Sequence, residues 1–155
     1  MAWSNSKIFS AFITDALNNL AAFDVDGDTL TVALFDNTIT PSQTVTSANT
    51  AYGAGVWASG GVSDASGWPA AGRNLASVTS GFASNVYTLD AADTVSANST
   101  TTLTNAYGCL VYENSLAAPV ADQGMSFNYF GGANSVVSGT FTVVWNASGI
   151  IALTL

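Results

Sequence analysis

Near the start of the chain, hydrophobic positions recur with the period of a helix. Between residues 5 and 20 the apolar side chains stand three or four positions apart, which places them on one face of an α-helix. They are Ile8, Phe9, Phe12, Ile13, Ala16, Leu17 and Leu20. The pattern predicts one amphipathic helix over residues 5–20. Because such helices usually pack within their own domain, we favour a helix that plugs one end of a sheet over an arm that docks on a neighbouring subunit.

Farther along, apolar and polar positions alternate in short runs, as they do in strands. The first run covers residues 29–35, and the later ones cover residues 73–82, 86–89, 100–112, 126–130, 139–145 and 150–155. Turn-forming residues separate them. Gly131 and Gly132 predict a turn after the fifth run, and the sequence Asn-Ala-Ser-Gly at residues 146–149 predicts a hairpin between the last two.

Seven or eight strands after one helix predict a mainly β fold. We expect a single domain over residues 1–155, built as an antiparallel β-sandwich or barrel of a jelly-roll-like kind. The main strands are expected in residues 73–155. The last third of the chain, residues 100–155, has the strongest apolar pattern and is expected to form the core.

Residues 37–72 interrupt this pattern with a long segment rich in Gly, Ser, Thr and Ala. A segment of that length without regular structure is uncommon in a compact domain unless it is functional, so we interpret it as an insertion that offers a contact surface. Its aromatic residues Tyr52, Trp57 and Trp68 either contact a partner or pin the loop to the core, and both interpretations stay open. With Trp3 and Phe9, they are the interface candidates.

The composition narrows the possible partners. Only 8% of the residues are charged, against about 25% in ordinary domains. A surface of Ser, Thr, Asn, Gly and Ala favours packing between copies, or else covers a monomer. The net charge of −8, with Lys7 and Arg73 as the only basic residues, argues against binding to nucleic acid or anionic membranes. The N-terminus lacks the features of a signal peptide, so we expect synthesis in the cytoplasm.

Few residues can carry chemistry. The chain has no histidine, which removes the commonest general base and the usual catalytic triads. Cys109, the only cysteine, stands in an apolar run and is predicted to be a buried, inert thiol. Among the acidic residues, Asp90 and Asp93 flank a turn, Glu113 ends a strand and Asp122 lies in a loop. None of these four is embedded in an apolar run, where a catalytic carboxyl with a raised pKa would stand. We therefore expect no enzyme and no cofactor.

One acidic cluster carries a weak metal signal. Asp24, Asp26 and Asp28 stand at alternate positions, as in calcium loops. The glycine and the twelfth residue of the segment do not match an EF-hand, which needs glycine at position six and glutamate at position twelve. We favour an acidic turn between the helix and the first strand over a calcium site of another kind.

Several segments carry a resemblance to a known family. They are the predicted helix followed by DGDTLTVALFDNTITP, then GWPAAGRNL, YTLDAADTV, TTTLTNAYGCLVYEN and the closing GTFTVVWNASGIIALTL. Together they cover most of the chain. In this order of features the sequence resembles small structural proteins encoded by tailed bacteriophages, especially those that infect actinobacteria. These segments are structural rather than catalytic, so no functional residue carries over.

The resemblance implies a non-enzymatic protein of the virion. We expect a capsid decoration protein, bound to the outer surface of the head, whose partners are the major capsid protein and copies of itself. Many weak contacts on such a lattice add up through a high effective concentration. The alternative is a tail or receptor-facing module that binds host-surface carbohydrate by stacking sugars on Trp57 and Trp68.

Overall fold

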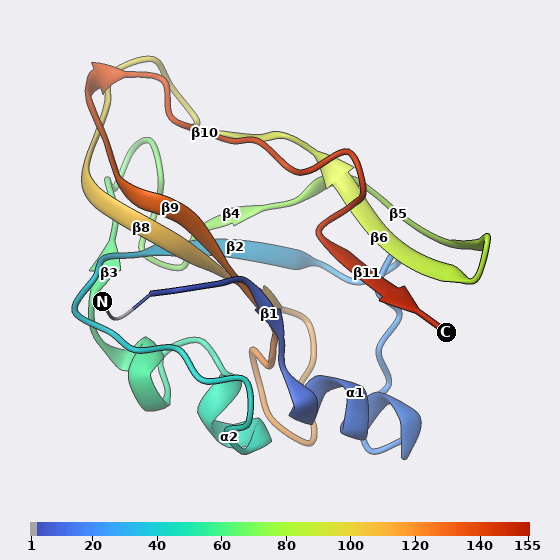
Figure 1. Cartoon of the computed structure of the whole chain (residues 1–155). Helices are drawn as coiled ribbons and strands as arrows, with labels where there is room; N and C mark the ends of the chain where they lie inside the picture. The colour runs from blue at the N-terminus through green and yellow to red at the C-terminus, as the bar shows by residue number, and fades with distance from the viewer. Residues whose placement is uncertain (1–2) are drawn as a thin grey trace.

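The computed structural model describes residues 3–155, which form a mainly antiparallel β structure (Figure 1). Its largest sheet has six strands in the order β1-β9-β8-β2-β3, with β4 also paired to β2. Their bounds are Lys7–Ile8 (β1), Gly124–Gly139 (β9), Thr101–Glu113 (β8), Leu30–Phe35 (β2), Gly61–Val62 (β3) and Arg73–Asn74 (β4). This confirms the predicted fold class.

Two smaller sheets complete the structure. One has the order β11-β6-β5, and the other pairs β10 with β7. Their bounds are Ala76–Ala83 (β5), Val86–Ala92 (β6), Thr94–Val95 (β7), Thr142–Val143 (β10) and Ile151–Thr154 (β11). Within residues 3–155 the sheets do not close on themselves, so the barrel alternative is wrong.

The predicted helix over residues 5–20 is too long. The helix α1 covers only Ser10–Leu17, because Lys7 and Ile8 are instead paired with Phe127 and Ser126 of β9. The backbone of Lys7 and Ile8 thus forms part of the large sheet, although Ile8 fits the helical apolar pattern. The helix lies with α2 (Ser47–Thr50) at one end of the large sheet, as Figure 1 shows, which fits an end plug.

The predicted C-terminal hairpin is also wrong. Val143 of β10 pairs with Thr94 of β7, whereas Ile151 of β11 pairs with Leu89 of β6. The two strands belong to different hydrophobic clusters: Val143 packs with Trp68, and Ile151 packs with Leu89. Burial in separate parts of the core therefore outweighs the local turn signal.

The expected turn at Gly131 and Gly132 does not occur, because β9 continues through both glycines. Gly131 has a positive φ of 83°, and the register between β8 and β9 shifts between Ala106 and Gly108. Such a bulge bends a strand without ending it. The two strands therefore extend together beyond the rest of the sheet, toward the upper left of Figure 1.

The core lies on both faces of β2, whose six residues are all buried. Ala33 and Phe35 belong to the cluster that contains Trp57, and Val32 and Leu34 belong to the cluster that contains Trp68. The core is therefore shared by the whole chain rather than formed by residues 100–155 alone.

Residues 37–72 are more regular than expected. They contain α2, the 3-10 turn η1 (Gly55–Ala58) and β3, and they are tied to the start of β8 through Asp64. The Asp64 carboxylate accepts hydrogen bonds from the backbone N–H groups of Thr102 (2.8 Å), Ser66 (3.0 Å) and Gly67 (3.1 Å), and from the Ser66 hydroxyl (2.9 Å). These donors, with the N–H of Thr102 first, lower the pKa of Asp64 to about 2.

The carboxylate of Asp64 should therefore stabilise the fold in a pH-dependent way. Because the pKa falls from an ordinary 3.8 to about 2, the stabilisation is complete above pH 3.8 and is lost as the pH falls through about 2. We expect Asp64→Asn to lower the urea midpoint at neutral pH and to lie closer to the wild type at about pH 2. An equal difference between the two proteins at both pH values would contradict this role.

Candidate docking groove

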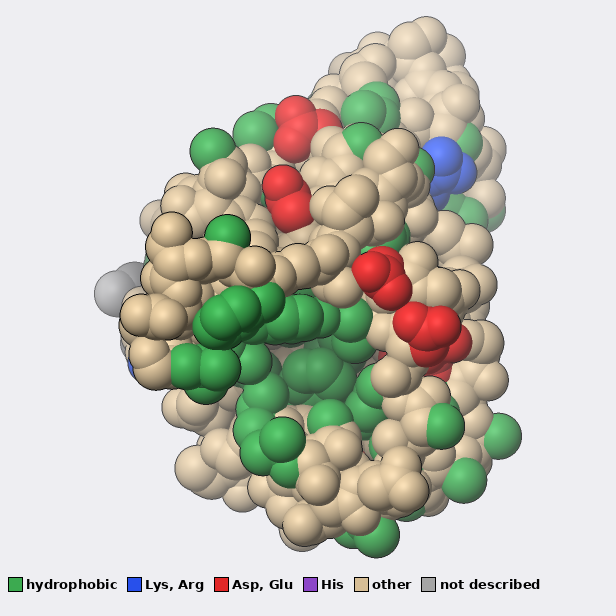
Figure 2. All heavy atoms as spheres, turned by 90° about the vertical axis from the view of Figure 1, so that its right-hand side faces the viewer, with side chains coloured by type: hydrophobic (Ala, Val, Ile, Leu, Met, Phe, Trp, Pro, Cys, Tyr) green, Lys and Arg blue, Asp and Glu red, His purple; other side chains and the backbone are tan. Residues whose placement is uncertain are grey.

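An apolar groove lies between α1 and β11. It encloses about 410 Å3 and is lined by α1, the loop that follows it, and residues of β6, β9 and β11. Figure 2 shows a hollow lined by a cluster of hydrophobic side chains, drawn in green. Among the described residues that line it, none has a charged side chain.

Two leucines at the rim of the groove are almost fully exposed. Leu17, at the end of α1, is 82% exposed, and Leu155, after β11, is 84% exposed. On the same helix face, Phe12 is buried and Ile13 is partly buried. The helix thus uses part of its apolar face for the core and leaves the rest open beside the groove. A contiguous exposed apolar surface of this kind is typical of a contact site.

One wall of the groove is a face of the β11-β6 pair, and the other side of β11 is an open sheet edge. Within residues 3–155, β6 is the only strand that pairs with β11. The N–H of Leu155 donates to the carbonyl oxygen of Asn85 (2.9 Å) in the same register that pairs Leu153 with Tyr87. Because ladder bonds alternate with a period of two, the backbone groups of Ala152 and Thr154 point away from β6. These groups are free to bind another strand.

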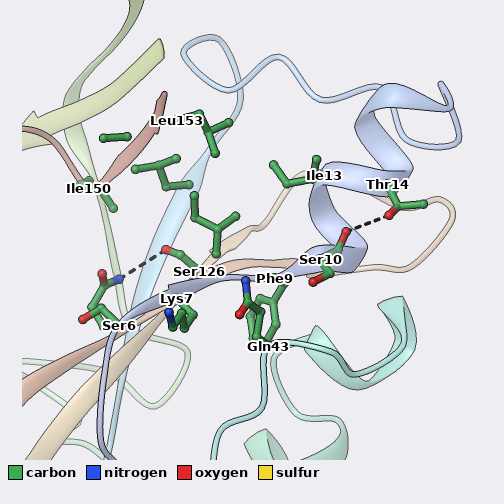
Figure 3. Close-up of a pocket in the computed structure, with 14 residues that line it drawn as sticks. Ser6, Lys7, Phe9, Ser10, Ile13, Thr14, Gln43, Ser126, Ile150 and Leu153 are labelled. Carbon is green, nitrogen blue, oxygen red and sulfur yellow. Dashed lines mark hydrogen bonds between the residues drawn. The ribbon is translucent and has the colours of Figure 1, made fainter. Parts of the chain in front are cut away.

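A more polar cleft, drawn in Figure 3, adjoins the groove. It encloses about 590 Å3 and shares Ile13, Ile151 and Leu153 with the groove. The exposed Lys7 of β1 and the side chain of Ser126 line it opposite β11. The two hollows together follow β11 along its length.

An acidic turn borders the groove. Phe23 and Val25 line the groove, and the exposed Asp24 and Asp26 alternate with them. Asp26 Oδ2 accepts a hydrogen bond from the Ser80 hydroxyl (2.7 Å), which lowers the pKa of Asp26 and keeps the carboxylate ionised. Figure 2 shows carboxylates along one side of the hollow.

The structure gives no support to calcium binding at Asp24, Asp26 and Asp28. The carboxylate of Asp28 accepts a hydrogen bond from the backbone N–H of Asp24 (2.7 Å), which closes the turn on itself. Within residues 3–155 no three acidic, histidine or cysteine side chains are arranged to hold a metal ion. The interpretation as an acidic turn agrees with this geometry.

Four of the five predicted interface residues lie in the core. Trp3, Phe9, Trp57 and Trp68 are all buried. The first three rings pack together in one core cluster, whereas Trp68 packs against Phe141 in the other. Only Tyr52 is partly exposed, and its ring stacks on Tyr112 with centroids 5.2 Å apart. Of the two interpretations of these aromatic residues, the structure supports the core for the four buried ones, and their role as contact anchors is wrong.

Sequence reasoning missed the residues that form the groove. Leu17 was expected on a helix face turned to the core, and Leu153 and Leu155 were expected in a paired hairpin. A sequence signal was available in the spacing of Phe23 and Val25 between aspartates, since alternation puts their side chains on the other side of the chain from the carboxylates.

Two further carboxylates are buried, which the sequence did not indicate. Asp15 accepts hydrogen bonds from the Ser47 hydroxyl (2.6 Å) and from Gln123 Nε2 (2.7 Å). Glu113 accepts hydrogen bonds from the backbone N–H groups of Ser115 and Leu116. Both groups hold neighbouring segments in place, and neither lines the groove.

Cys109 is buried and free, as expected. Burial raises the pKa of its thiol to about 12. Because the thiolate is the reactive form, the native protein should not react with a disulfide reagent such as DTNB at neutral pH. We expect one thiol to react after addition of urea. Rapid reaction of the folded protein would contradict the buried position.

Comparison with known proteins adds no relative: no protein-family model, curated protein or solved structure matches the chain. Among residues 3–155, no helix is long and apolar enough to span a membrane. The groove between α1 and β11 is the candidate site that the geometry offers.

Proposed function

We propose that this protein is a non-enzymatic structural protein of a bacteriophage virion, and that it decorates the outer surface of the head. The observation that carries the proposal is the exposed, uncharged groove between α1 and β11, with Leu17 and Leu155 at its rim. Transfer of such a surface from water into a contact is favourable, since the side chains that line it are apolar or uncharged.

The charge of the chain supports the same role. Ten acidic residues against two basic ones keep the protein away from nucleic acid during packaging, because like charges repel. Each copy needs only a weak contact, since a shell presents many equivalent sites close together. The partners in this proposal are the major capsid protein and neighbouring copies of the chain.

The alternative, a module that binds host-surface carbohydrate, loses the residues on which it relied. Sugars stack on exposed aromatic rings, and Trp57 and Trp68 are buried. The groove also lacks the charged or amide side chains that usually bind sugar hydroxyls among its lining residues within 3–155. We therefore retain decoration as the proposed function.

The copy number in purified phage particles tests this function. Quantitative mass spectrometry should find the protein in a fixed ratio to the major capsid protein, with many copies per particle. A few copies per particle would contradict decoration and favour a place in the tail. Absence from the particles would overturn the virion role altogether.

A further inference from the structure

We infer that two copies of the chain dock face to face through the groove, with the basic side of each copy over the acidic side of the other. This inference deepens the proposed function, on which it rests, because it assigns the groove to the contact between neighbouring copies. The observations that carry it are the exposed leucines, the uncharged lining and the opposite charges on the two sides of the groove.

The two sides of the groove carry opposite charges. On one side, the open edge of β11 borders the cleft that the exposed Lys7 lines. On the other side lies the acidic turn with the exposed Asp24 and Asp26. Asp26 is hydrogen-bonded to Ser80 of β5, and β5 is the strand farthest from β11 in the β11-β6-β5 sheet. A basic side and an acidic side thus flank one apolar groove.

This arrangement of charges is complementary to itself. In a symmetric dimer the same surface patch of both copies forms the contact. A twofold axis along the groove exchanges its two sides, so it places Lys7 of one copy beside the acidic turn of the other, twice in each dimer. An axis across the groove would bring like charges together instead. The charges therefore select one orientation, and they supply specificity more than affinity.

The apolar lining of the groove supplies the affinity. Leu17 and Leu155 are 82% and 84% exposed in the isolated chain, and Ile13 and Leu153 in the same groove are only partly buried. In the dimer each groove would cover the other and remove these side chains from water. None of the described lining residues has a charged side chain, so their burial does not require an ion to be desolvated.

A second copy matches the groove better than an unrelated protein does. Another partner would need its own apolar surface with acidic and basic sides in the reverse order, which a second copy has by symmetry. The net charge of −8 on each copy opposes association. We therefore expect a weak dimer, largely dissociated at about 1 μM and formed at about 100 μM. On a shell, a high effective concentration makes such a weak contact sufficient.

Sedimentation equilibrium of the full-length protein tests the dimer. Leu17→Asp places a charge at the rim of the groove and should weaken association at least about tenfold. Val137→Asp is the matched control, because Val137 is 78% exposed on β9 outside the groove and the change in charge is the same. This control should associate like the wild type. Urea unfolding of both variants establishes that they are folded.

An exchange of charges tests the orientation of the two copies. Lys7→Glu and Asp24→Lys should each weaken association, since each brings a like charge to the facing side of the partner copy. The double variant restores opposite charges and should associate about as strongly as the wild type. An effect of net charge alone predicts the reverse for Asp24→Lys, because the charge of each copy changes from −8 by +2 to −6 and repulsion decreases.

Chemical cross-linking reads the same contact directly. A carbodiimide joins an amine to a carboxylate that lies beside it, so it should join Lys7 to Asp24 or Asp26. Within one copy these residues lie on opposite sides of the groove. The product should therefore be a covalent dimer, and mass spectrometry of its peptides identifies the joined residues.

Several results would overturn the inference. They are a monomer at about 100 μM, unchanged association of Leu17→Asp, stronger association of Asp24→Lys, no recovery in the double variant, or no cross-link between Lys7 and the acidic turn. No particles are used, so each of these results leaves the copy-number test of the virion role intact. A failure of that test likewise leaves the sedimentation result intact.

Discussion

Replacement of Trp57 by alanine is expected to lower the free energy of unfolding by about 3–5 kcal/mol. Trp57 is only 2% exposed and lies at the centre of an aromatic cluster. Its ring centroid is 5.0 Å from that of Phe35, 6.0 Å from that of Trp3 and 6.1 Å from that of Phe9. Removal of the ring would leave a cavity where η1 packs on the large sheet. Since domains of this size are stable by about 5–15 kcal/mol, the variant should be close to unfolding.

Urea unfolding followed by circular dichroism measures this effect. Phe82→Ala is the matched control, because its ring is 60% exposed and its removal should change stability by about 0.5 kcal/mol or less. Within residues 3–155 the Trp57 Nε1–H has no hydrogen-bond partner, so Trp57→Phe removes an unsatisfied donor and should be less damaging than alanine. A loss for Trp57→Ala as small as that of the control would contradict the core position.

Replacement of Gly72 by alanine is expected to destabilise the fold by about 2–5 kcal/mol, the sum of backbone strain and a steric clash. Gly72 has a positive φ of 97°. A Cβ atom there would lie 2.1 Å from the carbonyl oxygen of Val32 and 2.9 Å from the backbone nitrogen of Ala33. These atoms belong to β2, which is buried on both faces and cannot move aside without disturbing both clusters.

Gly131→Ala separates the two parts of that effect. Gly131 also has a positive φ, of 83°, but a Cβ there would meet no atom within 4 Å. It should therefore show the backbone strain alone, about 1–2 kcal/mol. Thermal or urea unfolding of the two variants gives the comparison. Equal losses for Gly72→Ala and Gly131→Ala would mean that the clash with β2 is not present.

The sequence predicted the position of the buried strands well, but it did not predict which strands pair with each other. Residues 29–35 and 100–112 were predicted as strands and form β2 and β8, because their β-branched and apolar residues fit a packed sheet. The hairpin before Ile151 failed because turn chemistry acts over a few residues, whereas Phe141 and Ile151 are drawn into different clusters. Which cluster a distant residue joins cannot be predicted from the few residues around a turn.

The groove was harder to predict for a related reason. The helical pattern shows that Leu17 belongs to an apolar face, but it does not show where the covering elements end. Trp57 and Trp68 stood among small residues in an irregular segment, which is equally typical of a contact loop and of a loop pinned to the core. Exposure is a property of the whole packed chain, so only the structure distinguishes these cases.

The most direct test of the groove as the docking surface compares two variants on phage particles. Leu17→Asp places a charge at the rim of the groove, and Val137→Asp places one on the β8–β9 extension; both positions are exposed, at 82% and 78%, so neither variant should unfold. Particles that lack the protein are incubated with each variant, and the bound copies are counted. The proposed function predicts that Val137→Asp binds like the wild type and that Leu17→Asp does not. Full binding of Leu17→Asp, or loss of binding for Val137→Asp alone, would contradict it.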